Sequence, residues 1–95
     1  MTAYAIFIRE ATTDAAELAT YGAKVGAARD GHDMTALVRY GAFEVLEGDP
    51  IEGVVVIAFP TAAAARAWYD SPEYQAALVH RLAGARYRVV IVEGA

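Results

Sequence analysis

The sequence predicts a single α+β domain in which helices cover one face of a four-stranded antiparallel sheet. Three observations lead to this prediction. The chain has 95 residues, which is enough for one hydrophobic core and too few for two, so we expect one domain over residues 1–95. Hydrophobic residues make up 57% and charged residues only 21%, which excludes intrinsic disorder. Apolar segments with strand and helix periodicity follow in the order strand, helix, strand, strand, helix, strand.

The first strand and the first helix lie near the start of the chain. Tyr4–Arg9 is an apolar run rich in β-branched and aromatic residues, which predicts a strand. A helix is predicted over residues 14–29, with Asp14 as an acidic N-cap. Gly22 and Gly26 lie four residues apart on this helix, so its backbone can approach the sheet or leave room for a ligand. Of the two, we expect close packing.

A β-hairpin is predicted next. Residues 35–47 have the composition of a strand, with Gly41 as the candidate bulge. The turn sequence Gly48-Asp49-Pro50 then leads into a second apolar strand over residues 53–59. The two strands are therefore expected to pair with each other.

The second helical region is predicted in two pieces. An alanine-rich piece begins after Pro60, and Ser71, followed by a proline and a glutamate, is the predicted N-cap of the next piece. Tyr74, Leu78 and Leu82 repeat at four-residue spacing, which predicts the buried side of this helix.

The last strand completes the pattern. Gly84 is the predicted C-cap and Tyr87–Val92 the fourth strand, which gives the split β-α-β-β-α-β, or ferredoxin-like, arrangement. Residues 54–59 and 89–92 are apolar at both odd and even positions, so both faces of the sheet need cover. Because so short a chain has nothing left to cover the second face, we expect a homodimer that packs sheet against sheet.

Composition excludes several classes of function. The net charge of -4 gives no electrostatic basis for binding nucleic acid or an anionic membrane surface. No apolar run reaches the roughly 20 residues that cross a bilayer, and the start of the chain lacks signal-peptide features, so a cytoplasmic location is expected. The absence of cysteine excludes disulfides and thiolate metal sites. No glycine-rich nucleotide-binding pattern is present, and we expect no cofactor.

Four sequence elements together resemble a known family. They are Leu37-Val38-Arg39-x-Gly41, Glu44-Val45-Leu46-Glu47-Gly48-Asp49, Val54-Val55-Val56-Ile57-x-Phe59-Pro60 and the stretch from Ala65 to Gln75. These elements resemble the domain-of-unknown-function 1330 family. The resemblance implies a dimeric α+β barrel, the fold also used by cofactor-independent antibiotic-biosynthesis monooxygenases and muconolactone isomerase. It implies no established activity.

Arg39 is the first candidate for a functional residue. It interrupts an apolar strand, and a guanidinium in such a place needs a carboxylate partner, access to water or an anionic ligand. Glu44 and Glu47 on the same predicted hairpin are available partners. An internal ion pair and a ligand anchor are therefore both open.

Other candidates are aromatic residues and a histidine. Tyr21, Trp68 and Tyr74 are either core aromatics or, together with Arg39, the lining of a pocket between helices and sheet. His80 lies off the apolar stripe of its helix and is either a solvated flank or a general base. No metal site is expected, because His32 and its neighbouring aspartates lie in one short loop without a distant ligand.

Three functional hypotheses follow from these residues. The first is a dimeric protein that binds a small acidic or aromatic molecule between helices and sheet. The second is a cofactor-independent enzyme similar to a monooxygenase or an isomerase, with Arg39 holding an anionic or enolate oxygen. The third is a structural dimer module without a ligand. A deep pocket with an unpaired Arg39 would favour a ligand, whereas a filled interior with Arg39 bound to Glu44 or Glu47 would favour the structural module.

Overall fold

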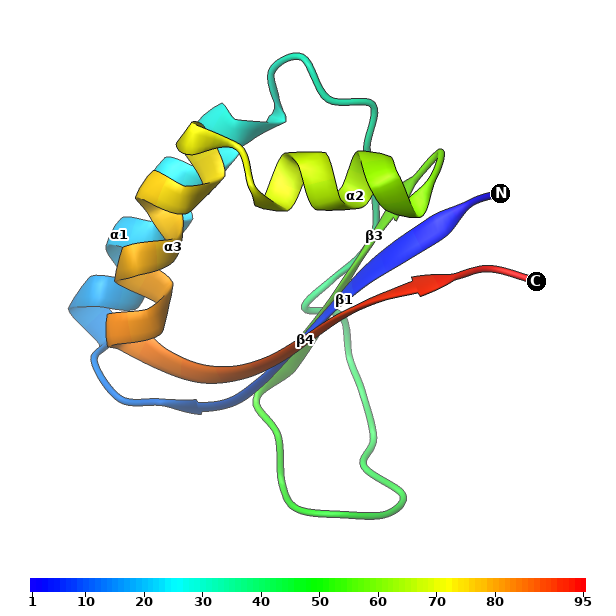
Figure 1. The fold of residues 1–95 in the computed structure, drawn as a ribbon. Coiled ribbons are helices and arrows are strands. Elements are labelled where there is room, and N and C mark those ends of the chain that lie inside the picture. Colours follow the sequence, from blue (N-terminus) through cyan, green and yellow to red (C-terminus); the bar gives the residue numbers. More distant parts are fainter.

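The helices lie on one side of a single antiparallel sheet (Figure 1). The computed structural model describes residues 1–95. Its elements are β1 (Ala3–Thr12), α1 (Ala15–Val25), a short 3-10 helix η1 (Gly26–Arg29), β2 (Thr35–Arg39), β3 (Gly53–Phe59), α2 (Ala62–Tyr69), α3 (Pro72–Gly84) and β4 (Ala85–Glu93). This order matches the predicted β-α-β-β-α-β pattern, with the second helical region in two pieces.

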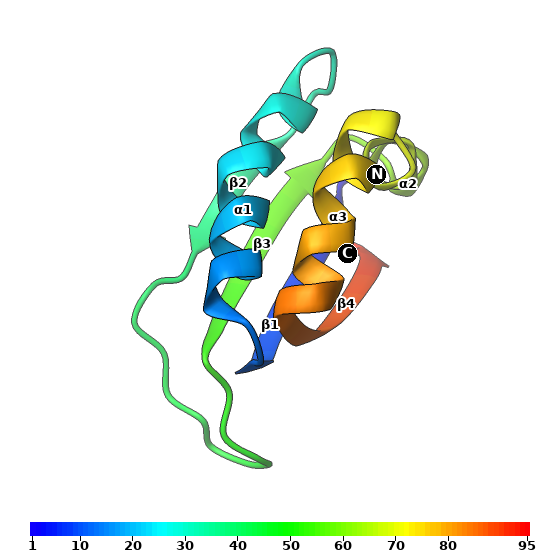
Figure 2. The same cartoon turned by 90° about the vertical axis from the view of Figure 1, so that its left-hand side faces the viewer.

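The sheet has the strand order β2-β3-β1-β4, and all neighbours are antiparallel. Helices α1 and α3 lie side by side over the sheet, and α2 runs across one end (Figures 1 and 2). The ferredoxin-like α+β prediction is therefore confirmed. No helix has the length and hydropathy that crossing a membrane requires. The ends of the chain are neighbours, because the Gly94 N–H donates to the Thr2 carbonyl over 2.7 Å.

Helix starts follow the predicted capping signals. The Asp14 carboxylate accepts hydrogen bonds from the backbone N–H groups of Ala16 and Glu17, and the Ser71 hydroxyl accepts one from the backbone N–H of Tyr74. Pro72 occupies the first turn of α3, where its missing N–H costs no helical hydrogen bond.

The strand predicted over residues 35–47 is wrong beyond Arg39. Tyr40 has a positive φ of 54°, a conformation that side chains rarely adopt and that ends the strand. Residues 40–52 form a loop instead, and residues 41–50 are all exposed. The irregularity in β2 lies between Ala36 and Val38 rather than at Gly41. Strand composition was misleading here because these apolar residues have no neighbouring strand to pair with.

The structure contradicts close packing at Gly22 and Gly26 and the C-cap role of Gly84. A Cβ added at Gly22 or Gly26 would meet no atom within 4 Å, so close packing is not the reason for these glycines. Gly84 is the last residue of α3 rather than its C-cap, and a Cβ there would lie 2.6 Å from the backbone nitrogen of Leu18. Its carbonyl accepts hydrogen bonds from the N–H groups of Thr13 and Asp14. Gly84 is therefore the residue that lets α1 and α3 approach.

The buried side of α3 differs from the predicted stripe at one position. Tyr74 and Leu78 are buried as predicted, but Leu82 is 66% exposed. Arg81 takes the inward position instead and is only 3% exposed. With 3.6 residues per turn, a stripe that starts at Tyr74 and Leu78 reaches position 81 before position 82.

The outer face of the sheet carries no helix (Figure 1). Side chains alternate along each strand, so Ile6, Ile8 and Val56 point away from the buried Phe7 and Ile57. Val90 and Val92 on β4 share this outer face and are 53% and 46% exposed. Within one chain, this apolar face is therefore uncovered.

Candidate functional site

A cavity of about 530 Å³ lies between α1 and the sheet. Ligand pockets in proteins commonly have this size and an apolar lining. Its walls come from α1, η1, the first three strands, the residues on either side of β2, Trp68 of α2 and Tyr87 of β4. The lining residues are Phe7, Arg9, Leu18, Tyr21, Gly22, Val25, Gly26, Arg29, Met34, Ala36, Arg39, Tyr40, Val55, Ile57, Trp68 and Tyr87.

Glycines make room for the cavity on its helix side. Gly22 and Gly26 line it, and the space where their Cβ atoms would stand is empty within 4 Å. Any larger residue there would project a side chain into this space. These two positions therefore fit the expectation that glycine leaves room for a ligand better than the expectation that it allows close packing.

The charged groups around the cavity are all cationic. Arg9, Arg29 and Arg39 line it, and no Asp or Glu does. Arg29 and Arg39 are exposed and form no ion pair. Arg9 is partly neutralised, because its Nε lies 3.1 Å from Glu52 Oε1.

Glu52 itself is held outside the cavity as an anion. The Thr12 hydroxyl donates a hydrogen bond of 2.6 Å to it. This hydrogen bond and, to a lesser degree, Arg9 lower the pKa of the Glu52 carboxyl. The opposite charge nearest to Arg9 therefore persists at neutral pH, whereas Arg29 and Arg39 have no such partner.

Two pairs of tyrosine hydroxyls lie at the cavity wall. The hydroxyls of Tyr21 and Tyr74 are 3.0 Å apart, and those of Tyr40 and Tyr87 are 2.6 Å apart. Burial is the main cause that raises the pKa of Tyr21, Tyr74 and Tyr87 above the usual value. These hydroxyls therefore keep their protons at neutral pH and can donate hydrogen bonds.

Stability is expected to fall in alkaline solution because of these tyrosines. An unfolded tyrosine ionises near pH 10, whereas the raised pKa values keep the folded hydroxyls protonated. Their stabilising contribution is therefore complete below about pH 10 and is lost as pH rises further. Urea unfolding between about pH 8 and pH 11 measures this loss. Tyr21→Phe should show a shallower loss above pH 10, and an unchanged slope would contradict the assignment.

Trp68 joins the cavity to the aromatic core. It is 1% exposed, and its ring centroid lies 4.3 Å from that of Tyr74 and 5.6 Å from that of Phe59. Its Nε1 is buried without a hydrogen-bond partner. Buried N–H groups without partners are uncommon in proteins, and this one has no surface open to the cavity.

Arg81 is the buried cation that the sequence did not suggest. Its guanidinium carbon lies 4.8 Å from the ring centroid of Tyr87 and within 6 Å of the rings of Phe7 and Tyr21. Its Nε has no partner. The one sequence signal for its burial is its position one turn after Leu78. The neighbouring Leu82 is apolar and was therefore predicted to be buried instead.

The structure brings together three of the four predicted pocket residues. Tyr21, Arg39 and Trp68 line the cavity, whereas Tyr74 lies behind Tyr21 and does not line it. Arg39 forms no ion pair with Glu44 or Glu47, and all three are exposed. Further lining residues that the sequence did not suggest are Arg9, Arg29, Tyr40 and Tyr87.

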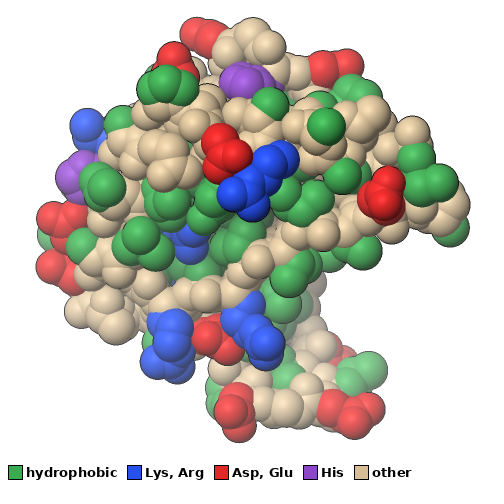
Figure 3. All heavy atoms as spheres, in the orientation of Figure 1, with side chains coloured by type: hydrophobic (Ala, Val, Ile, Leu, Met, Phe, Trp, Pro, Cys, Tyr) green, Lys and Arg blue, Asp and Glu red, His purple; other side chains and the backbone are tan.

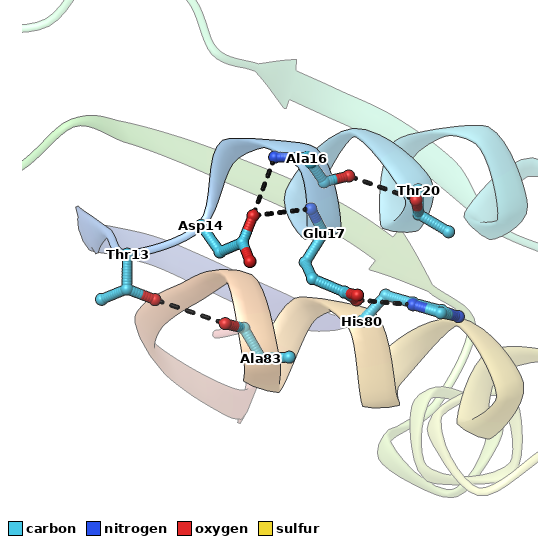
Figure 4. Close-up of polar contacts among 7 residues, drawn as sticks. All are labelled: Thr13, Asp14, Ala16, Glu17, Thr20, His80 and Ala83. Carbon is cyan, nitrogen blue, oxygen red and sulfur yellow. Dashed lines mark hydrogen bonds and ion pairs between the residues drawn. The ribbon is translucent and has the colours of Figure 1, made fainter.

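His80 lies away from this cavity, between α1 and α3 (Figure 4). Its Nδ1 is 2.7 Å from the Glu17 carboxylate, and it lines neither this cavity nor a second one of about 370 Å³ beside α2 and β4. A general-base role for His80 stays a prediction, and the geometry gives it no substrate cavity. No cluster of three or more metal-ligating side chains is present.

Solved structures share this fold over almost the whole chain. A protein of unknown function, RPA0582 from Rhodopseudomonas palustris, has a TM-score of 0.77 at 22% identity, covering 99% of this chain and 82% of that one. A dimeric protein of unknown function with a ferredoxin-like fold from Bacteroides fragilis has a TM-score of 0.65 at 10% identity, covering 98% and 96%. SnoaB, a cofactor-independent oxygenase from Streptomyces nogalater, has a TM-score of 0.61 at 11% identity, covering 99% and 93%.

At these identities the structures establish the fold alone. No curated protein matches the chain. The sequence pattern of a domain of unknown function, DUF1330, matches residues 2–95. With nearly every residue inside that match, the chain belongs to the DUF1330 family.

Proposed function

We propose that this protein binds a small aromatic anion, such as an aromatic carboxylate, in the cavity between α1 and the sheet. One observation carries the proposal: the cavity is largely apolar, and all the charged groups that line it are guanidinium groups. Apolar walls favour a ring, and a guanidinium binds a carboxylate through two parallel hydrogen bonds.

Different lining residues would contact the anionic group and the aromatic ring of such a ligand. Arg29 and Arg39 have no carboxylate partner and supply the positive charge for the anionic group. Phe7 and Ile57 form an apolar floor. When Tyr74 donates to Tyr21, the Tyr21 hydroxyl can donate a hydrogen bond to a hydroxyl or keto oxygen on the ring, and Trp68 supplies part of the apolar wall.

The structural-module hypothesis receives less support. It requires a filled interior and a paired Arg39, whereas the interior contains a cavity of about 530 Å³ and Arg39 is free. An unpaired guanidinium beside an apolar cavity contributes little to folding, so ligand binding is the better explanation.

A cofactor-independent enzyme, similar to a monooxygenase or isomerase, is the second candidate. The observation that favours it is the Tyr21 hydroxyl, which stays protonated and is held by Tyr74. Such a donor, together with Arg39, would stabilise an enolate oxygen. Aerobic incubation of the protein with an aromatic carboxylate probe, 1-hydroxy-2-naphthoate, followed by mass spectrometry, tests for such an activity. Recovery of the acid unchanged would leave binding as the function.

Arg39→Ala tests ligand binding directly. Because Arg39 is exposed and unpaired, we expect the variant to keep its stability within about 0.5 kcal/mol. It should lose most of the thermal stabilisation that 1-hydroxy-2-naphthoate gives the wild type, up to about 2–3 kcal/mol near saturation. The measurement is a melting curve with and without the acid, with neutral 1-naphthol as the ligand control.

Lys24→Ala is the matched protein control for that experiment. Lys24 is a cation of α1 that does not line the cavity, so its loss should leave the stabilisation intact. Equal losses in both variants would indicate only nonspecific attraction of an anion. A wild type that responds to no acid in a broad screen of aromatic carboxylates would contradict the proposal.

Gly22→Ala separates stability from binding in the opposite direction. An alanine in the middle of α1 should stabilise the helix by up to about 1 kcal/mol, and its methyl group meets no protein atom. Because Gly22 lines the cavity, the same methyl group should narrow it. We therefore expect a higher melting temperature and weaker binding of 1-hydroxy-2-naphthoate, followed through the fluorescence of Trp68. Unchanged binding would place the ligand elsewhere.

The chain is also proposed to form a homodimer through the outer face of the sheet. Ile6, Ile8 and Val56 lie on this face without cover from their own chain, and exposed apolar faces of this kind mark interfaces. The Bacteroides fragilis protein with the same fold is described as dimeric. A cytoplasmic location remains a prediction of the sequence.

A further inference from the structure

The geometry points to loop 40–52 as an arm that docks over β4 of a second copy of this chain. This inference rests on the proposed homodimer and adds which parts of the two copies meet. We call residues 41–50 the arm.

The arm carries apolar side chains that its own chain leaves exposed. All of its residues are exposed, including Phe43 at 47% and Leu46 at 83%. It extends from β2 and β3 beyond the side of the sheet that the helices leave bare (Figures 1 and 2). A second sheet packed against that side would therefore lie within reach of the arm.

The charges of the arm are all negative. Glu44, Glu47 and Asp49 lie on it, and none of them forms an ion pair within the chain. Figure 3 shows acidic side chains on both sides of the projecting lobe that the arm forms. A partner surface that receives the arm should therefore be basic.

The complementary surface is the beginning of β4. Arg86 and Arg88 alternate with the inward Tyr87 and so belong to the outer face, and both are exposed. Arg88 has no ion pair, and Arg86 lies 3.3 Å from a half-buried glutamate, Glu10. Among the outward residues of β4, these two are the cations.

Topology decides whether this surface can meet the arm. Arg9 pairs with both Gly53 and Tyr87, so the arm and the start of β4 lie at the same end of the sheet. They lie at opposite edges, because the strand order is β2-β3-β1-β4. The arm therefore cannot satisfy Arg88 of its own chain without crossing two strands.

Twofold symmetry resolves this separation. When two sheets face each other about an axis parallel to the strands, the edges are exchanged and the ends are kept. Each arm then lies over the start of the partner's β4, and the contact occurs twice. An axis perpendicular to the strands would instead bring the arm over the other end of β2, next to Asp33. That arrangement places like charges together, which disfavours it.

Disulfide trapping tests this arrangement, because the chain contains no cysteine. Glu47→Cys protein is mixed with Arg88→Cys protein and oxidised gently. We expect a covalent heterodimer. Val92→Cys is the matched control at the other end of the same face of β4, and Thr35→Cys reports the perpendicular axis. Stronger trapping with Thr35→Cys or Val92→Cys than with Arg88→Cys would overturn the inference.

Charge reversal gives a second readout. Glu47→Arg or Arg88→Glu alone should weaken the dimer by about tenfold, since each exposed pair occurs twice, and the two changes together should restore it. No weakening, or no restoration, would overturn the placement of the arm. Light scattering on the unmodified chain distinguishes failure of the homodimer from failure of the arm placement. A monomer in that measurement contradicts the homodimer itself. A dimer that is trapped through Thr35→Cys contradicts only the placement of the arm.

Discussion

Replacing Trp68 with alanine is expected to lower the free energy of unfolding by about 3–5 kcal/mol, the usual cost of removing a buried tryptophan. Trp68 is 1% exposed and contacts three other rings, those of Phe7, Phe59 and Tyr74. Its loss would join a new void to the existing cavity, where the surrounding structure has little to collapse onto. A small domain has only about 5–15 kcal/mol of net stability, so a large part of it depends on this side chain.

Urea unfolding followed by circular dichroism measures this effect, because the variant lacks its only tryptophan. Leu82→Ala is the matched control: it shortens a side chain that is 66% exposed and should change stability by less than about 0.5 kcal/mol. Similar losses in both variants would show that Trp68 is not the centre of the core.

A carboxylate at the centre of the outer sheet face is expected to abolish the dimer. Val56 pairs with Ile6 on β1 and with Val38 on β2. In a dimer that packs sheet against sheet, Val56→Asp would bury an unpaired charge twice, at a cost of about 3 kcal/mol or more, which corresponds to at least about a hundredfold weaker association. The isolated chain should still fold, because that face is open to water in the monomer.

Ile91→Asp distinguishes loss of the dimer from loss of the fold. Ile91 lies on the opposite face of the sheet and contacts the core, so a carboxylate there should unfold the chain. Leu82→Asp places the same charge on an exposed helix position and should do neither. Sedimentation at micromolar concentration combined with circular dichroism gives both readouts. A wild-type monomer of about 10 kDa, or a fully dimeric Val56→Asp, would contradict the interface.

Local signals in the sequence predicted most of the fold. Asp14, Ser71 and Pro72 fix helix starts through their own side chains, which need no knowledge of distant residues. The strand end at Arg39 could not be predicted in this way. It depends on the absence of a pairing partner for residues 41–50 and on the positive φ of Tyr40, and composition carries neither.

Of the charged residues in the candidate site, only the one that stood in an unusual sequence context was predicted. Arg39 stood out because it is charged in an apolar strand, and it does line the cavity. Arg9 and Arg29 lie at the ends of the strand and helix that the sequence predicts, where arginine is ordinary, and only the fold brings them to the same cavity. Arg81 was missed for a different reason: its burial depends on the rings of Phe7 and Tyr21, which lie far away in the sequence.

Because the two chain ends are adjacent, the segments of the polypeptide can be connected in a different order. Ala3 pairs with Glu93, and the Gly94 N–H binds the Thr2 carbonyl, so a short peptide linker can join the present ends without disturbing the sheet. New ends can then be opened within the arm, where no residue is buried and cutting is best tolerated. Such a circular permutant keeps every strand pairing of the domain but interrupts the arm. It therefore separates the residues needed for folding from those needed for dimer assembly.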